Sequence, residues 1–208
     1  MIAALFVEPG GIYDGRADVE LWPEARDARL YAGPHPVVAH PPCERWGNLW
    51  WSARHHGKGL GDDGGCFAAA LAAVERWGGV LEHPEGSRAW DAFGLPRPHR
   101  GQGWVRMLVG RPGWACSVDQ GAKSYGHAAR KRTWLYYFAP RGQPPAALDW
   151  SDGSTGVWVA QGPRGASPAE RAAKGITLMV STAAGKRAKK ATPPAFAEVL
   201  LQLARGTA

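Results

Sequence analysis

The chain has 208 residues, of which 45% are hydrophobic, and it carries a formal net charge of +7 with an isoelectric point near 9.6. This length and apolar content predict a single folded domain over residues 1–208 and exclude a wholly disordered chain. The N-terminal segment lacks the basic region of a signal peptide, and no apolar run is long enough to span a bilayer, so we expect a cytoplasmic protein without a membrane partner.

The cysteine pattern argues against both a disulfide framework and a closed metal site. There are three cysteines, Cys43, Cys66 and Cys116, an odd number without a C-x-x-C pair. We therefore predict no metal. One of the three thiols is a candidate nucleophile, and the other two are typical of cysteines in or near a core.

The positive charge gathers late in the chain, in the runs 129–132 and 186–190. Such runs are typical of a polyanion-binding surface, although a solvated basic face explains the second equally well. Three tryptophans, Trp46, Trp50 and Trp51, follow Cys43 in a glycine-containing loop. Exposed aromatic rings there would be able to stack on nucleic-acid bases.

The first half of the chain predicts two short buried strands. Residues 3–7 form an apolar run that ends at Glu8-Pro9-Gly10-Gly11, and residues 36–39 form another that ends at Pro41-Pro42. The polar stretch between them, residues 14–29, has helical character near residues 23–30.

The remaining elements indicate an α/β fold. Residues 66–77 have apolar side chains at helical spacing, and a third strand begins at Val80 and ends at Glu82-His83-Pro84. Strand, helix and strand in this order favour an open, mostly parallel sheet flanked by helices. Further strands are predicted over 105–109, 115–118 and 133–138, a short loop-rich insert over 139–175, and a final helix capped by Thr192.

Three predicted strands end in reactive or charged side chains, those of Glu8, Cys43 and Glu82. In open parallel sheets, ligands bind beyond the carboxyl ends of the strands. Each residue alone is also typical of a buried thiol or of an acid in a turn, but the coincidence of all three favours a functional site.

Five segments, in order along the chain, resemble motifs of the DNA cytosine-5 methyltransferases. Residues 5–11 are similar to the cofactor loop Leu-Phe-x-Gly-x-Gly-Gly, and residues 41–43 to the Pro-Cys nucleophile motif. Residues 82–84 stand where the family has Glu-Asn-Val or Glu-Asn-Pro. Residues 125–132 resemble its basic motif, and residues 191–197 its last motif, Asn-x-Val-Pro-Pro-x-Leu-Ala.

The resemblance implies a Rossmann-like methyltransferase fold and a set of catalytic roles. The thiolate of Cys43 would add to carbon 6 of a flipped pyrimidine, and Glu82 would assist at N3. Arg130 and Arg132, two apart and therefore on one side of a strand, would hold the base and the DNA backbone. This chemistry requires a depressed pKa for Cys43, helped by the charge of Arg45, Arg130 or Arg132, and a raised pKa for Glu82.

The resemblance further implies S-adenosylmethionine as cofactor and DNA as partner. Residues Phe6, Glu8, Gly10, Gly11 and Pro41 would bind the cofactor, in a compact, phage-type enzyme of a bacterial or phage-infected cell. Two departures stand out: Glu8 replaces a family glycine, and the interval between Gly11 and Cys43 is too short for the family's usual ribose-binding segment.

Three alternatives remain open from the sequence. The first is a related pyrimidine-modifying enzyme that uses a different cofactor or adds a different group. The second is a non-catalytic DNA-binding relative. The third is a Cys–His hydrolase with His40 or His83 as base, which the adjacent prolines and the lack of an oxyanion loop disfavour.

Overall fold

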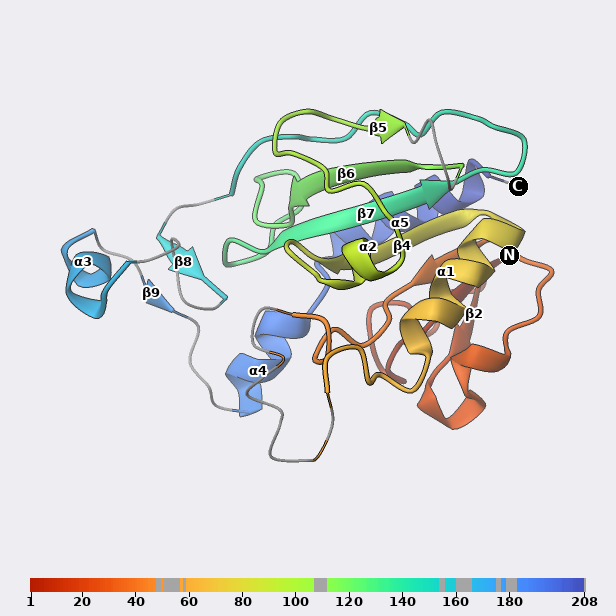
Figure 1. The fold of residues 1–208 in the computed structure, drawn as a ribbon, viewed down its shortest axis with the longest axis horizontal. Coiled ribbons are helices and arrows are strands. Elements are labelled where there is room, and N and C mark those ends of the chain that lie inside the picture. Colours follow the sequence, from red (N-terminus) through yellow and green to blue (C-terminus); the bar gives the residue numbers. More distant parts are fainter. Residues whose placement is uncertain are drawn as a thin grey trace.

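The computed structural model places a sheet between two layers of helix (Figure 1). It describes residues 1–47, 50, 57, 59–106, 112–153, 156–159, 166–174, 177–178 and 183–207. Trp51 and the outer part of the strand predicted over 105–109 lie outside these residues.

The described strands form a seven-stranded sheet of order β2-β1-β3-β4-β7-β6-β5. In that order they are Val19–Trp22, Ile2–Leu5, Val37–Ala39, Gly79–Pro84, Arg132–Phe138, Trp114–Asp119 and Val105–Arg106. The first four are mutually parallel, whereas β7 is antiparallel to both of its neighbours and β5 is antiparallel to β6.

The sheet is therefore mixed, and the prediction of a mostly parallel sheet is wrong. Antiparallel residue pairs outnumber parallel ones in the described strands, because β7 pairs along its length with both β4 and β6. The loop 120–131 between β6 and β7 contains no helix. A parallel neighbour would require a longer crossover connection, usually a helix, so this link favours an antiparallel pair.

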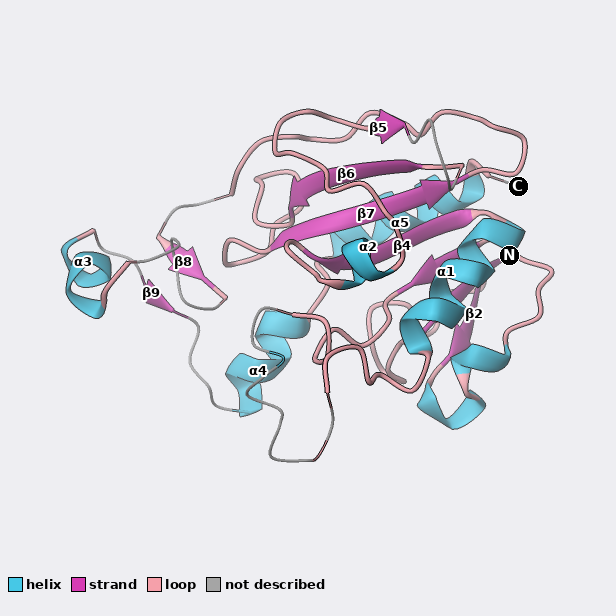
Figure 2. Ribbon diagram, in the orientation of Figure 1, coloured by secondary structure: helices cyan, strands magenta, loops and turns pink. Residues whose placement is uncertain are grey.

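Helices cover both faces of the sheet (Figure 2). The predicted helix is confirmed as α1, Cys66–Trp77, whose Phe67, Leu71 and Val74 pack into the core on one face. The other face is covered by α5, Pro194–Arg205, which buries Phe196 and Leu200 among others. The N-cap of α5 is Pro193, so the prediction of Thr192 as the cap is wrong.

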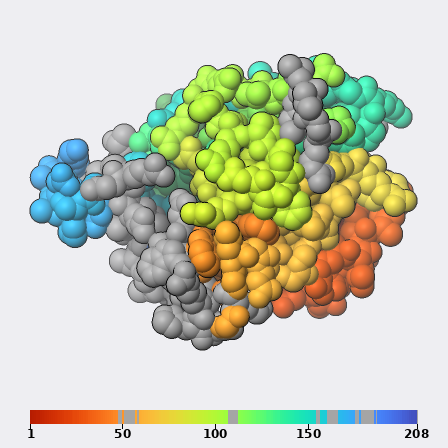
Figure 3. Space-filling view, in the orientation of Figure 1, coloured from red at the N-terminus to blue at the C-terminus, as the bar shows by residue number. Residues whose placement is uncertain are grey.

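The segment after β4 lies on the α1 face. It contains the short helix α2, Ala89–Ala92, and its yellow-green atoms cover the middle of that face in Figure 3. The side chain of Trp90 is completely buried there.

The stretch expected to be polar and partly helical contains the strand β2, followed by two single-turn 3-10 helices, η1 (Glu24–Arg26) and η2 (Ala28–Leu30). All four β2 residues are only partly buried, because β2 lies at an edge of the sheet. The usual signal of a buried strand, a continuous apolar run, is accordingly missing.

The predicted insert is richer in structure than loops alone. It contains β8, Val157–Trp158, and α3, Pro168–Ala173, which begins with a capping box between Ser167 and Glu170. β8 pairs in parallel with β9, Thr177–Leu178, and these elements stand apart from the main sheet in Figure 1. A further helix, α4, spans Ala183–Lys190.

Among the described residues, no helix combines the length and the apolar character needed to cross a membrane.

Candidate active site

The strand order places a topological switch point between β1 and β3. The chain passes from β1 to β2 on one side and then returns to β3 on the other side of β1. Ligands of doubly wound sheets bind outside the carboxyl ends of the strands at such a point. The loops that follow β1 and β3 start there side by side, since the amide of His40 donates to the carbonyl of Leu5 at 3.1 Å.

The loop after β1 carries the residues predicted to bind a cofactor. Phe6 is half-buried with a φ of +59°, and Glu8, Gly10 and Gly11 are exposed. Gly10 has a φ of +73°, and no described atom lies within 4 Å of the position a Cβ would take. Asp14 closes the loop by accepting the amide of Gly10 at 2.6 Å. The last predicted residue of this set, Pro41, is buried beside the switch point.

Cys43 begins a turn after the two prolines, with its carbonyl accepting the amides of Trp46 and Gly47 at 3.0 and 2.9 Å. Its side chain is partly buried. Burial raises the pKa of the Cys43 thiol, the carboxylates of Glu82 and Glu44 raise it further, and Lys190 opposes them. The prediction of a depressed pKa is thus wrong, because burial of the thiol, together with the two carboxylates, outweighs the charge of Lys190.

Glu82 lies within β4 rather than beyond its end, and its side chain is buried in a polar network. Its Oε2 accepts from Nδ1 of His40 at 3.0 Å. Its Oε1 accepts from the amide of Gln120 at 3.1 Å and from the hydroxyl of Thr133 at 3.3 Å. The side chain of Gln120 also donates to Thr133 at 2.8 Å. Oε2 is thus held from the loop after β3, and Oε1 from β7 and the loop before it.

These donors keep Glu82 ionised. Burial pushes the pKa of Glu82 upward, but the hydrogen bond from His40 and the charge of Lys131 outweigh it and hold the pKa at about 2. The prediction of a raised pKa is therefore wrong for the protein without substrate. The sequence alone offered no sign of the compensating donors, which come from distant segments.

Lys131 is a site residue that the sequence analysis missed. Its Nζ donates to the carbonyls of Lys190 and Ala191 at 3.2 and 2.9 Å, at the C-terminal end of α4. Burial lowers the pKa of Lys131, while the charges of Glu82 and Cys43 act to raise it. The period of two was a usable signal, because it places Lys131 and Thr133 on the face opposite the flanking arginines.

Arg130 and Arg132 lie together, in keeping with their spacing, but on the other side of the chain from Glu82. Both guanidinium groups form ion pairs with Asp152 and lie near the ring of Trp158, at 5.1 and 5.9 Å from its centroid. Arg130 also donates to the buried Asp119 at 3.2 Å. The structure therefore brings Lys131, and neither arginine, to the carboxylate and the thiol.

His40 and Tyr13 complete the network. The phenol oxygen of Tyr13 lies 2.9 Å from Nε2 of His40, whose other ring nitrogen contacts Glu82. Burial raises the pKa of Tyr13 strongly, and Glu82 adds to that effect, so the phenol keeps its proton. No sequence motif pointed to Tyr13, which the short loop after β1 carries back to the switch point.

His83, the next residue of β4, points to the opposite face and packs against the rings of Phe67 and Trp90. Burial lowers its pKa from 6.5 to about 4, although Glu82 opposes this. The unfolded chain therefore binds more protons than the folded one between these values, and stability falls as the pH falls from 6.5 towards 4. We expect His83 to cause a loss of about 2–3 kcal/mol between pH 7 and pH 4.5.

Urea denaturation of His83→Leu between pH 7 and pH 4.5 measures this contribution. The variant should show a smaller fall in unfolding free energy than the wild type, whereas the exposed-site control His99→Gln should keep the full fall. An unchanged pH dependence in His83→Leu would refute the assignment.

The tryptophans near Cys43 differ in their environments. Trp46 is buried, and its indole donates to Asp63 at 2.7 Å, so the prediction of an exposed stacking ring is wrong for Trp46. Trp50 is half-buried.

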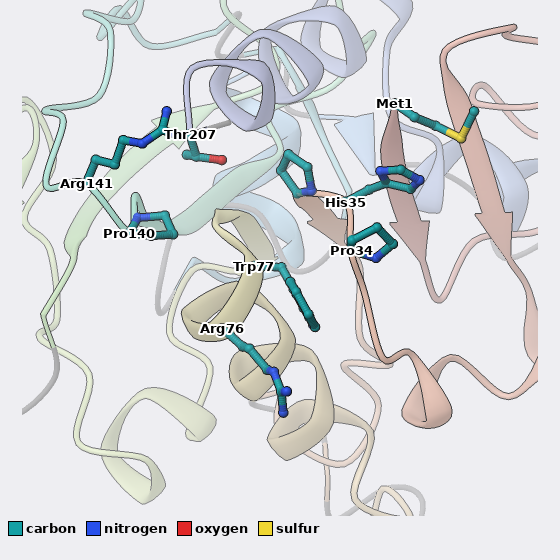
Figure 4. A pocket seen from close by; sticks show the side chains of 9 residues that line it. Met1, Pro34, His35, Arg76, Trp77, Pro140, Arg141 and Thr207 are labelled. Atoms are coloured by element: carbon teal, nitrogen blue, oxygen red, sulfur yellow. The ribbon is translucent and has the colours of Figure 1, made fainter.

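A separate hollow of about 460 Å³ lies at the opposite edge of the sheet, near the starts of β1 and β3 (Figure 4). Trp77 and Arg76 line it from the end of α1, together with Met1 and Thr207. It contains none of the predicted site residues.

In the part of the chain that the structure describes, no three His, Cys, Asp or Glu side chains are grouped to hold a metal ion. No protein-family model matches the chain, and no curated protein matches it significantly.

Proposed function

We propose that the chain is a DNA cytosine-5 methyltransferase-like enzyme. The thiolate of Cys43 adds to carbon 6 of a flipped pyrimidine, Glu82 assists at N3, and a methyl group is transferred to carbon 5. The observation that carries the proposal is that Oε2 of Glu82 accepts from Nδ1 of His40 at 3.0 Å, which brings the carboxylate to the end of β3, where Cys43 follows His40 three residues later.

The fold supports this proposal through its parallel half. Strands β1 to β4 are parallel, α1 crosses from β3 to β4, and the strand order changes direction between β1 and β3, as in a Rossmann-like sheet. The loop after β3, which carries Cys43, and the loop after β1, which carries Gly10 and Gly11, both start at that point.

The chemistry needs a thiolate and a proton at N3. As the Sγ–C6 bond forms, the C5=C6 electron pair forms a C4=C5 bond, and the C4=N3 pair takes up a proton at N3. The resulting enamine makes carbon 5 nucleophilic. Lys131 and Lys190 supply positive charge that favours the thiolate of Cys43. After transfer, loss of the proton on carbon 5 expels Cys43, and N3 returns its proton.

The residues after β1 fit S-adenosylmethionine, since Gly10 leaves open space at an exposed loop beyond the strand. Phe6, Glu8, Gly10 and Gly11 would hold it together with Pro41. When bound, this cofactor supplies an electrophilic methyl group. Glu8, which replaces a family glycine, adds an exposed carboxylate to this loop.

A DNA partner is supported by charge near the nucleophile. The net charge is +7, and α4 presents Arg187, Lys189 and Lys190 close to the Cys43 loop, since Lys190 forms an ion pair with Glu44. These groups, with Arg130 and Arg132, would bind the backbone around an extruded base. A reducing cytoplasm of a bacterial or phage-infected cell would keep the Cys43 thiol free.

A Cys–His hydrolase is disfavoured by the same network. Both ring nitrogens of His40 are engaged, one by Glu82 and the other by Tyr13, so neither is free to take the thiol proton of Cys43. His83 lies on the opposite face of the sheet. A different transferred group and a non-catalytic DNA-binding role remain outcomes of the test.

Covalent trapping tests the proposal. DNA containing 5-fluorocytosine should form a stable adduct with the wild type in the presence of S-adenosylmethionine, because fluorine cannot leave carbon 5 as the proton does. Cys43→Ala should form none. The matched control Cys66→Ala removes another partly exposed thiol, which lies near Asp63 and Arg29 rather than Glu82, and should react as the wild type does.

Each other outcome has a defined meaning. An adduct that forms equally in Cys43→Ala would refute the nucleophile. A Cys43-dependent adduct that carries no methyl group would point to another donor. Salt-dependent DNA binding without any adduct would favour the non-catalytic role.

A further inference from the structure

His40 lies between the buried carboxylate of Glu82 and the hydroxyl of Tyr13, at a place where the proposed chemistry needs a proton. Glu82 is ionised in the resting protein, yet N3 of the base has to receive a proton. A carboxylate in that state can only accept hydrogen bonds, so the proton between it and His40 belongs to Nδ1 of the imidazole. The nearest proton to Glu82 that can be transferred therefore lies on His40.

Tyr13 makes this proton replaceable. Its hydroxyl can accept from a protonated Nε2 or donate to a bare one, so the 2.9 Å contact persists in both charge states of the ring. Gln120 and Thr133, by contrast, hold Oε1 with groups that do not ionise at neutral pH. Gln120 and Thr133 thus fix Oε1, and Oε2 is the oxygen that can receive a proton from His40.

We propose that His40 is a positioning residue that acts through Glu82 and supplies the proton that reaches N3. The inference rests on the proposed function. The protonated imidazole passes its Nδ1 proton to Oε2 of Glu82, and the carboxyl group formed in this way passes that proton on to N3. His40 is left neutral with its proton on Nε2 facing Tyr13. When Cys43 is expelled, the N3 proton returns by the same route.

Other titratable groups face this relay from the surrounding elements. Tyr13 and Arg16 lie after β1, Cys43 and Glu44 after β3, Lys131 before β7, and Lys190 at the end of α4. Addition requires Cys43 without its proton and a proton that His40 passes to Glu82, so the rate of addition should have a bell-shaped pH profile.

Hydrogen exchange at carbon 5 isolates these steps from methyl transfer. Reversible addition of Cys43 to DNA carrying 5-tritiated cytosine releases tritium to water without a methyl donor, because carbon 5 of the enamine takes a solvent proton before the thiol leaves. We expect His40→Gln to slow Cys43-dependent release at pH 7 by about 100-fold or more and to lose the falling limb of the profile. Tyr13→Phe should slow the release less than His40→Gln does and should shift that limb.

The outcomes separate the two proposals. No Cys43-dependent release by the wild type overturns the proposed function itself. Release by the wild type, with a His40→Gln profile of unchanged shape, overturns the relay even if the rate is lower, because a merely structural defect lowers the rate at every pH. If His40→Gln does not fold, Tyr13→Phe decides, and an unshifted limb in that variant overturns the relay.

Discussion

Replacing Gly79 with alanine should destabilise the protein by about 3–6 kcal/mol, a large part of the stability of a typical domain. Gly79 begins β4 with a φ of +124°, and an added Cβ would lie 1.9 Å from the carbonyl oxygen and 2.7 Å from the nitrogen of Val37. Both atoms belong to the backbone of β3, so the two strands would have to separate. Because β3 leads to Cys43 and β4 contains Glu82, the same change should disturb the candidate site.

Urea denaturation with Gly94→Ala as control separates the cost of the backbone conformation from the cost of the contact with Val37. Gly94 also has a positive φ, +67°, but no described atom lies within 4 Å of its built Cβ. Its replacement should cost only the backbone strain, about 1 kcal/mol. Equal losses in both variants would show that the contact with β3 is unimportant.

Removal of the Asp119 carboxylate should cost about 3–5 kcal/mol, as expected when one partner of a buried ion pair is lost. Asp119 ends β6, and its side chain is 2% exposed. It accepts the amides of Gly121, Lys131 and Gly153 at 2.9, 3.0 and 3.1 Å, and it forms the ion pair with Arg130. Asp119→Ala would leave these donors unpaired.

Asp152 provides the matched control, because it binds the same arginine but is 53% exposed. Asp152→Ala should change the unfolding free energy by about 1 kcal/mol or less. If chemical denaturation gave the two variants similar stabilities, the hydrogen bonds of Asp119 to the loop 120–131 would not contribute the expected stability.

Local patterns in the sequence predicted the elements that bury a regular apolar face. The spacing of Phe67, Leu71 and Val74 gave the bounds of α1, and the runs before Glu8 and Pro41 located β1 and β3. Strand β2 was not predicted, because an edge strand is only half-buried and has no continuous apolar run. The direction of β7 escaped because sheet order depends on pairing between distant segments, which periodicity does not encode.

The candidate site divides in the same way. Cys43 and Glu82 were predicted from their positions after or near strand ends; Cys43 follows β3, and Glu82 follows the last residue of β4 that pairs with β3. Their pKa shifts were predicted with the wrong sign, because burial raises the pKa of Cys43 and the hydrogen bond from His40 and the charge of Lys131 lower that of Glu82. Lys131 was overlooked in favour of more conspicuous arginines, although strand alternation already distinguished the two faces.

The antiparallel partner of β4 also governs when the site comes into being during folding. Cys43 and His40 follow the parallel strand β3, whereas Gln120, Lys131 and Thr133 belong to the β6–β7 hairpin. Strand β7 of this hairpin pairs Leu135 with Glu82. Until that long-range pairing forms, the carboxylate lacks two of its three hydrogen-bond donors, and desolvating it is costly. The electrostatic environment of Glu82 and Cys43 is therefore complete only once the hairpin has docked against β4.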